Sequence, residues 1–288
     1  MGSRKRVRAG GQLRIESLGY GDEIVGVFPS ETWMRRGKSI VAVSQRRIGD
    51  NAAITLNTDL FEPVAYHPET QVVLLYGASR LIANYAWTSV EIAVIGVPFD
   101  ESSAVVSAGI RTDGFIAVAF SNSVVLVNKL DGSPFQLVPI DGVEVVGFAG
   151  QTMLAAADRV VYAVNDDLSL HKIADYSGIA TSITGVDGRA VLTTDEVVLD
   201  IYLYRGRFSS FALPGARSAA LGDGETVWVL HGLDGVSLIN GQTVESTIQL
   251  PDMAKGTSIL PLIALRQAQI RTSPGQCNQL YLLDPEDC

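Results

Sequence analysis

Residues 143–174 read VEVVGFAGQTMLAAADRVVYAVNDDLSLHKIA and contain four short runs, mostly apolar, separated by turn residues. The expected strands are Val143–Phe148, Met153–Ala157, Val160–Asn165 and Ser169–Ala174. Each run has the length of an ordinary strand, about four to eight residues. The segments between them, such as Asp158-Arg159, are short enough for tight turns. This stretch therefore predicts one small antiparallel sheet of four strands.

The same pattern extends along the chain. Further expected strands are Val72–Tyr76, Phe115–Phe120, Val124–Asn128, Ala190–Thr193, Val197–Tyr204 and Thr226–Leu230. Asp-Gly and Asn-Gly pairs stand between many of them, and these pairs favour the turns that match the twist of flanking strands. No convincing helical period extends over about 12 residues, so helix is a minor component and a parallel α/β fold is disfavoured.

A repeat organises these strands. Small or apolar residues ahead of a turn recur at intervals of 36 to 40 residues, at Ile24, Val64, Ala104, Val143, Ile179, Ser218 and Thr257. One interval holds four short strands with their turns, which is the size of one blade of a β-propeller. The last unit, residues 257–288, is one strand short. We expect Gln12–Leu18 to pair into that unit and close the ring, which removes open sheet edges at the seam.

The chain resembles a seven-bladed β-propeller of the WD40-like or YVTN-like kind over residues 12–288, through its repeat period. The segment Ser123–Gly132 resembles a third strand of YVTN type. Blade-end Trp-Asp, blade-start Gly-His, kelch double-glycine and sialidase-type Asp-box motifs are absent from the sequence. The resemblance implies a fold and no particular activity. The expected core lies between blades, because the strands are apolar on both faces.

Charge is distributed unevenly between the beginning of the chain and the rest. The net charge of −9 argues against a protein that coats nucleic acid with its whole surface. Residues 1–11 are expected to be a flexible basic tail, with one propeller domain over residues 12–288. The tail carries the candidate nucleic-acid-binding residues Arg4, Lys5, Arg6 and Arg8. The alternative is an uninvolved flexible end.

Targeting signals are not evident. The basic segment is not followed by the apolar stretch of a secretory signal, and no apolar window of about 18 residues is long enough to span a membrane. The expectation is a soluble, cytoplasmic protein without membrane insertion. Cys277 and Cys288 are interpreted as reduced thiols, with a disulfide as the alternative.

Loop residues are the candidates for partner binding. The expected turns between second and third strands hold Arg46, Arg47, Arg80, Arg159 and His231. A second candidate is the polar segment Pro29–Lys38, interpreted as a loop, whose aromatic and basic residues suit an interface anchor. Its members are Trp33, Met34, Arg35 and Arg36. The alternative is that Trp33 folds back onto its own blade.

Catalytic and metal-binding patterns are weak. His67 ends an expected inner strand and is the candidate residue at the mouth of the central channel. The three histidines have no spacing typical of metal ligands, and no nucleophile elbow or phosphate-binding loop occurs. We therefore predict no catalytic residue, metal or cofactor.

The sequence favours a non-enzymatic scaffold that presents loop rims to other protein subunits, within a larger assembly. Two alternatives remain open. One is a hydrolase or lyase with a small-molecule site at the channel mouth, which would need polar residues from several blades beside His67. The other is a nucleic-acid-associated subunit that contacts RNA or DNA through the basic tail.

Overall fold

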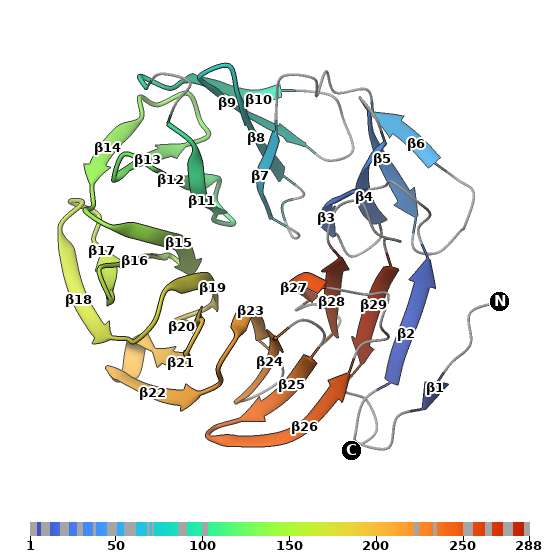
Figure 1. The fold of residues 1–288 in the computed structure, drawn as a ribbon. Helices are drawn as coiled ribbons and strands as arrows, with labels where there is room; N and C mark the ends of the chain where they lie inside the picture. Colours follow the sequence, from blue (N-terminus) through green and yellow to red (C-terminus); the bar gives the residue numbers. More distant parts are fainter. Residues whose placement is uncertain are drawn as a thin grey trace.

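The structure, a computed structural model, is a ring of antiparallel β-sheets (Figure 1). It describes the backbone of residues 5–6, 12–17, 23–27, 31–36, 39–44, 51–54, 62–67, 70, 72–85, 91–99, 103–221, 225–232, 235–249, 256–262, 267–272 and 279–284. Side chains are described for residues 64–65, 67, 70, 72–84, 93–99, 103–221, 225–232, 235–245 and 247. Within these ranges the one helical element is the 3-10 turn η2 (Leu203–Arg205). The all-β class predicted from the sequence is confirmed.

Six of the sheets described have four strands each, and the chain runs through each of them in sequence order. Their strands are β3 (Glu23–Val27), β4 (Glu31–Arg36), β5 (Ser39–Ser44), β6 (Asn51–Ile54); β7 (Glu62–His67), β8 (Val72–Gly77), β9 (Arg80–Tyr85), β10 (Glu91–Gly96); β11 (Val105–Ile110), β12 (Phe115–Phe120), β13 (Val124–Lys129), β14 (Gln136–Pro139); β15 (Val143–Ala149), β16 (Thr152–Ala157), β17 (Val160–Val164), β18 (Leu170–Asp175); β19 (Ala180–Val186), β20 (Arg189–Thr194), β21 (Val197–Tyr202), β22 (Arg207–Ala212); and β23 (Ala216–Leu221), β24 (Thr226–His231), β25 (Gly235–Asn240), β26 (Thr243–Gln249).

A further sheet joins the two ends of the chain. Its strand order is β1 (Lys5–Arg6), β2 (Gln12–Ser17), β29 (Gln279–Asp284), β28 (Gln267–Thr272) and β27 (Gly256–Leu262). Strand β2 pairs antiparallel with β29, with Gln12 opposite Asp284. The short strand β1 pairs with β2, so residues 5–6 of the expected tail lie beside the ring. Arg4 and Arg8 lie outside the described residues.

Strands that alternate in direction place their connections at two opposite rims. Second-to-third turns and the connections between sheets share one rim, called here the 2–3 rim, where the Gly215 N–H donates to the Asp195 carbonyl (2.7 Å). It includes residues 121–123, 158–159 and 195–196. First-to-second and third-to-fourth turns share the other, the 3–4 rim, where the Leu203 N–H donates to the Gly188 carbonyl (2.8 Å). It includes residues 111–114, 150–151, 187–188 and 203–206.

A register shift near the start of the innermost strand recurs in the sheets described. The shifts fall at Ile24/Gly26, Pro63/Ala65, Val105/Ser107, Val143/Val145, Ala180/Ser182, Ala216/Ser218 and Gly256/Ser258. A bulge adds one residue, bends the strand and increases its twist. These positions lie 36 to 42 residues apart, so they follow the repeat seen in the sequence.

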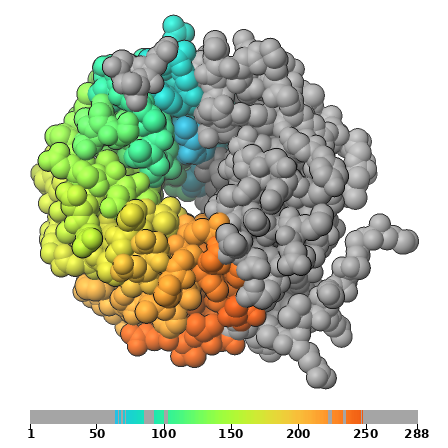
Figure 2. Space-filling model, in the orientation of Figure 1, coloured from blue at the N-terminus to red at the C-terminus, as the bar shows by residue number. Residues whose placement is uncertain are grey.

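The apolar core lies between adjacent sheets, as the sequence predicted. Along β12, Val118 and Phe120 pack with Leu74 of the preceding sheet. The intervening Ala119 packs with Met153 of the following sheet. Alternate side chains of a strand point to opposite faces, so each central strand contributes to two cores. Figure 2 shows residues 103–221 as one continuous arc of the ring.

Inner strands approach each other closely at a glycine. A Cβ atom built on Gly185 of β19 would lie 2.8 Å from the Cα of Ala149 in β15 and still closer to the Phe148 carbonyl oxygen. Both obstacles are backbone atoms, so rotation of a side chain cannot relieve the overlap. The absence of a side chain at Gly185 therefore sets the spacing between these two sheets.

We expect Gly185→Ala to lower the free energy of unfolding by about 1–3 kcal/mol, because the added methyl overpacks the junction between the sheets. Urea unfolding followed by circular dichroism measures this change. The matched control is Gly96→Ala, also in a strand, where an added Cβ would have no atom within 4 Å. Equal stability of the two variants would show that the sheets can separate without cost.

Candidate functional site

Three of the partner-binding residues predicted at turns, Arg80, Arg159 and His231, are dispersed around the 2–3 rim. Arg80 begins β9, Arg159 lies in the β16–β17 turn and His231 ends β24, so they belong to three different sheets. A complete sheet lies between the sheets of Arg80 and Arg159, and another between those of Arg159 and His231. Their order in the ring is as predicted, and the structure does not bring them together.

His231 takes part in polar contacts within its own sheet. Its Nε2 lies 2.8 Å from the hydroxyl oxygen of Ser237, which in turn lies 2.9 Å from the hydroxyl oxygen of Thr247. The three residues come from β24, β25 and β26. This chain of contacts links three strands and gives the ring of His231 a structural role in addition to its place at the rim.

The interpretation of Pro29–Lys38 as a loop is wrong for its central part. Trp33, Met34, Arg35 and Arg36 belong to β4, a central strand in which Trp33 pairs with Gly26 on one side and Ala42 on the other. The run from Glu31 to Arg36 contains Thr and Trp, which favour strands, and backbone pairing on both sides outweighs its polar composition. The side chains of these residues lie outside the described set.

Arg46 and Arg47 do not follow the strand order expected from the sequence. Arg46 and Arg47 follow β5 and precede β6, so they lie between the third and fourth strands of their sheet instead of the second and third. The cause is β4, which takes the place of the expected loop and shifts the numbering by one strand. Both residues, together with Cys277 and Cys288, lie outside the described residues.

His67 is the last residue of the inner strand β7, as predicted. Its Nδ1 accepts a hydrogen bond from the backbone N–H of Thr70 at 3.3 Å. This contact holds the ring against the turn that leads to β8. No three His, Cys, Asp or Glu side chains that could hold a metal ion gather in the described residues. No described helix is long and apolar enough to cross a membrane.

A polar and aromatic cluster at the 3–4 rim was not predicted. At its centre is Tyr202, the last residue of β21, which pairs with Arg189 of β20 on one side and Arg207 of β22 on the other. The Arg189 guanidinium lies 5.2 Å from the centre of the Tyr202 ring, and that of Arg207 lies 4.6 Å from it. Arg205 in η2 adds a third guanidinium at 5.8 Å.

The tight connection between β21 and β22 creates this arrangement. The expected strand Val197–Tyr204 ends two residues early, because the chain turns through η2 (Leu203–Arg205). Gly206 ends the turn at φ 56°, a left-handed conformation that glycine adopts without a side-chain penalty. Arg207 then pairs directly with Tyr202. The turn therefore places Arg205 and Arg207 close to the same aromatic ring.

Arg189 is the buried member of the three arginines. Its Nε donates to one carboxylate oxygen of Asp200 at 2.9 Å and its Nη2 to the other at 3.0 Å. The same Nη2 donates to the carbonyl oxygen of Glu225, which precedes β24 in the next sheet (3.0 Å). Burial, together with the negative charge of Asp200, raises the pKa of the Tyr202 hydroxyl.

A cleft of about 280 Å³ opens beside this cluster, between sheet β19–β22 and sheet β23–β26. We call it the Tyr202 cleft, and its lining residues are Asp200, Tyr202, Arg207, Phe208, Ser209, Glu225, Gly241 and Gln242. Phe208, which lines the cleft, is 49% exposed, and Tyr204 in η2, two residues from Tyr202 along the chain, is 82% exposed. The site therefore combines exposed aromatic surface with arginines on a fixed support.

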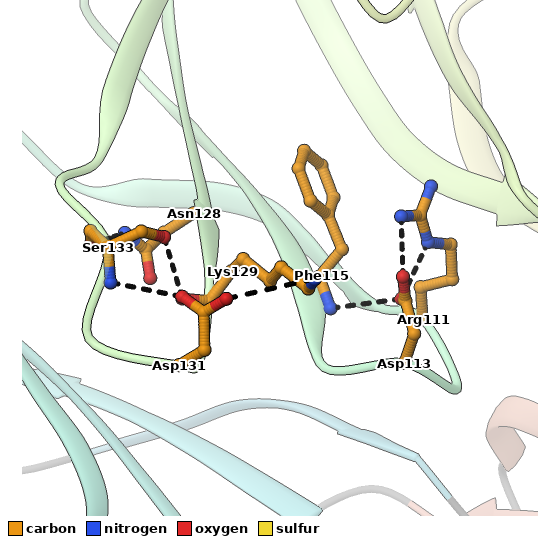
Figure 3. A network of polar contacts seen from close by, with 7 residues as sticks. All are labelled: Arg111, Asp113, Phe115, Asn128, Lys129, Asp131 and Ser133. Carbon is orange, nitrogen blue, oxygen red and sulfur yellow. Dashed lines mark hydrogen bonds and ion pairs between the residues drawn. The ribbon is translucent and has the colours of Figure 1, made fainter.

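At the sheet β11–β14, the polar side chains of the same rim bind one another and the backbone (Figure 3). Arg111 donates two hydrogen bonds to Asp113, both of 2.7 Å, and a third of 2.6 Å to the Gln151 carbonyl of the next sheet. These hydrogen bonds from Arg111 are the main reason that the pKa of Asp113 is lowered. Nearby, Asp131 accepts a hydrogen bond from the Ser133 N–H (3.0 Å), which stabilises the turn between β13 and β14. These polar groups stabilise the rim itself.

Sequence reasoning missed the Tyr202 cleft, although a local signal was present. The segment YLYRGRF, residues 202–208, holds three aromatic residues and two arginines in an acidic protein. Only residues 202–204 of this segment fall within the expected strand Val197–Tyr204. The contributions of Arg189 and Glu225 could not be seen in this segment, because they arrive from other strands.

Solved β-propellers are similar to this chain in structure. The WD40 β-propeller domain of Doa1 has a TM-score of 0.72 at 14% identity, covering 96% of this chain and 98% of that one. The β-propeller domain of Cps50 (Swd1) of Myceliophteria thermophila has a TM-score of 0.70 at 9% identity, covering 93% and 98%. BBS1N, solved in complex with ARL6DN, has a TM-score of 0.67 at 12% identity, covering 96% and 97%.

No family model matches the sequence, and no curated protein matches it. The fold is therefore established by structure alone: the chain is a WD40-like β-propeller. This confirms the resemblance that the repeat period indicated.

Proposed function

We propose that this chain is a non-enzymatic scaffold that binds another protein and serves as a subunit of a larger assembly. Propeller neighbours support a protein-interaction role in general, since one of them was solved in complex with a second protein. A ring of sheets packed through buried cores offers a rigid support for such binding. Rigid surfaces lose little conformational entropy when they bind a partner.

The observation that carries the proposal is the exposed aromatic surface next to the Tyr202 cleft. Tyr204 and Phe208 remain 82% and 49% exposed, and the arginines Arg205 and Arg207 lie between them in the sequence. Tyrosine and arginine are enriched among the residues that contribute most to binding at protein interfaces. The proposed docking surface therefore lies at the 3–4 rim.

Replacing both Tyr204 and Phe208 with alanine is expected to reduce recovery of a stoichiometric protein partner at least about tenfold. The measurement is purification of the tagged full chain from its native cells, at low salt and with nuclease, followed by quantitative mass spectrometry. Both side chains are exposed, so the melting temperature should change little.

The matched control replaces two exposed aliphatic residues elsewhere, Ile179 and Leu170, which are 64% and 40% exposed. This variant should keep the partner. Loss of the partner from both variants, or from neither, would contradict docking at this surface. A partner that disappears on nuclease treatment would favour the nucleic-acid alternative, in which Arg4, Lys5, Arg6 and Arg8 contact RNA or DNA.

A further inference from the structure

We propose that the Tyr202 cleft binds an acidic side chain from an extended segment of a partner protein, while apolar residues of that segment contact Tyr204 and Phe208. This inference rests on the proposed scaffold function and specifies the chemistry of the partner. It follows from the unneutralised positive charge at the cleft, from the volume of the cleft and from the residues that line it.

The charge argument distinguishes the three arginines. Arg189 is neutralised by two hydrogen bonds to Asp200 inside the structure. Arg207 meets Glu225 through a single contact of 3.5 Å, and both side chains are about half exposed, at 52% and 57%. Such exposed pairs contribute little and exchange readily with another anion. Arg205 is exposed and has no carboxylate at ion-pair distance among the described residues.

Two cationic groups are therefore accessible in a protein whose net charge is −9. Their guanidinium groups lie over the same ring, 4.6 Å and 5.8 Å from the centre of Tyr202. This contact restrains them before any ligand arrives. A planar guanidinium binds a carboxylate through two parallel hydrogen bonds, so the pair is suited to an Asp or Glu side chain.

Size and surroundings favour a protein segment over nucleic acid. A volume of about 280 Å³ is at the lower limit for small-molecule pockets and is sufficient for one or two side chains. The cleft also carries two carboxylates, Asp200, which is paired with Arg189, and Glu225, so its small excess of positive charge suits one carboxylate better than a chain of phosphates. A single carboxylate can instead replace Glu225 beside Arg207. The exposed rings of Tyr204 and Phe208 supply apolar contact for the neighbouring residues of a peptide.

The test uses the full chain and fluorescence anisotropy. The probe is a labelled peptide, GLDELEDLG, and its uncharged counterpart is GLNQLQNLG. We expect the acidic peptide to bind at least about tenfold more tightly than the neutral one. Its affinity should fall as NaCl rises from about 0.05 M to about 0.3 M, because ions screen the exposed arginines.

The double variant Arg205→Ala with Arg207→Ala should weaken binding of the acidic peptide by about tenfold or more. The matched control is Arg159→Ala, an exposed arginine at the 2–3 rim, which should leave binding unchanged. Circular dichroism should show the same fold for all variants. Equal binding of the acidic and neutral peptides would overturn the proposal, as would unchanged binding by the double variant.

Two further probes separate other ligand classes, a phosphoserine peptide and an oligouridylate. Preference for either of these over the acidic peptide would overturn the proposal. Failure of the acidic peptide is also distinguishable from failure of the scaffold function. If the peptide does not bind, but the Tyr204 and Phe208 variant still loses its cellular partner, the docking surface stands and the acidic partner chemistry is wrong.

Discussion

Replacing Asp200 with alanine is expected to lower the free energy of unfolding by about 3–5 kcal/mol. The side chains of Arg189 and Asp200 are only 11% and 9% exposed, so the arginine would keep its charge in a buried position without its partner. Arg205 and Arg207 lie close to the same ring of Tyr202 and would add repulsion. Urea unfolding, followed by tryptophan fluorescence to which the buried Trp228 contributes, measures the change.

Two controls make this prediction specific. Asp175→Ala removes an exposed ion pair with Lys172, in which the lysine is 56% and the aspartate 70% exposed. This variant should lose less than about 1 kcal/mol of unfolding free energy. The double variant Arg189→Met with Asp200→Leu removes both buried charges and should recover most of the stability lost in Asp200→Ala. If Asp200→Ala costs no more than Asp175→Ala, the buried pair between β20 and β21 does not stabilise the fold.

The fold could be predicted because its signals are local and repeated. Runs such as Phe115–Phe120 and Val124–Asn128 contain enough apolar and β-branched residues to define strands by themselves, and the structure places strands there. The Asp158-Arg159 turn is equally local, since both residues take positive φ, at 48° and 64°, between paired strands. A period of about 40 residues then gives the size of one propeller sheet.

The candidate site depends on contacts that no local pattern contains. Arg189, Tyr202, Arg207 and Glu225 come from three strands and the connection that leads to a fourth, in two sheets. Their meeting follows from the registers of β20, β21 and β22 and from the packing of the next sheet. Trp33 illustrates the reverse case. A polar neighbourhood suggested a loop, although pairing with strands on both sides decides its conformation.

Removing the Phe120 side chain is expected to destabilise the ring as much as breaking the buried ion pair. Phe120 in β12 is completely buried. Its ring meets Tyr76 of the preceding sheet at a centroid distance of 5.5 Å and Phe99, in the connection from β10 to β11, at 5.1 Å. Alanine would lose the transfer free energy of the ring and leave a cavity, at a cost of about 3–5 kcal/mol.

The comparison of Phe120→Ala with Phe208→Ala tests where the stability of this fold resides. Both variants lose the same atoms, but Phe208 is 49% exposed at the Tyr202 cleft. Phe208→Ala should therefore lower the free energy of unfolding in urea by less than about 1 kcal/mol. Phe120→Leu should lie between them, because it fills part of the cavity. If Phe120→Ala and Phe208→Ala lower the free energy of unfolding equally, the core between sheets β7–β10 and β11–β14 contributes less to stability than its burial implies. The expected difference would show that packing between sheets contributes far more to stability than the exposed aromatic residues of the rim, so these residues are free to bind a partner.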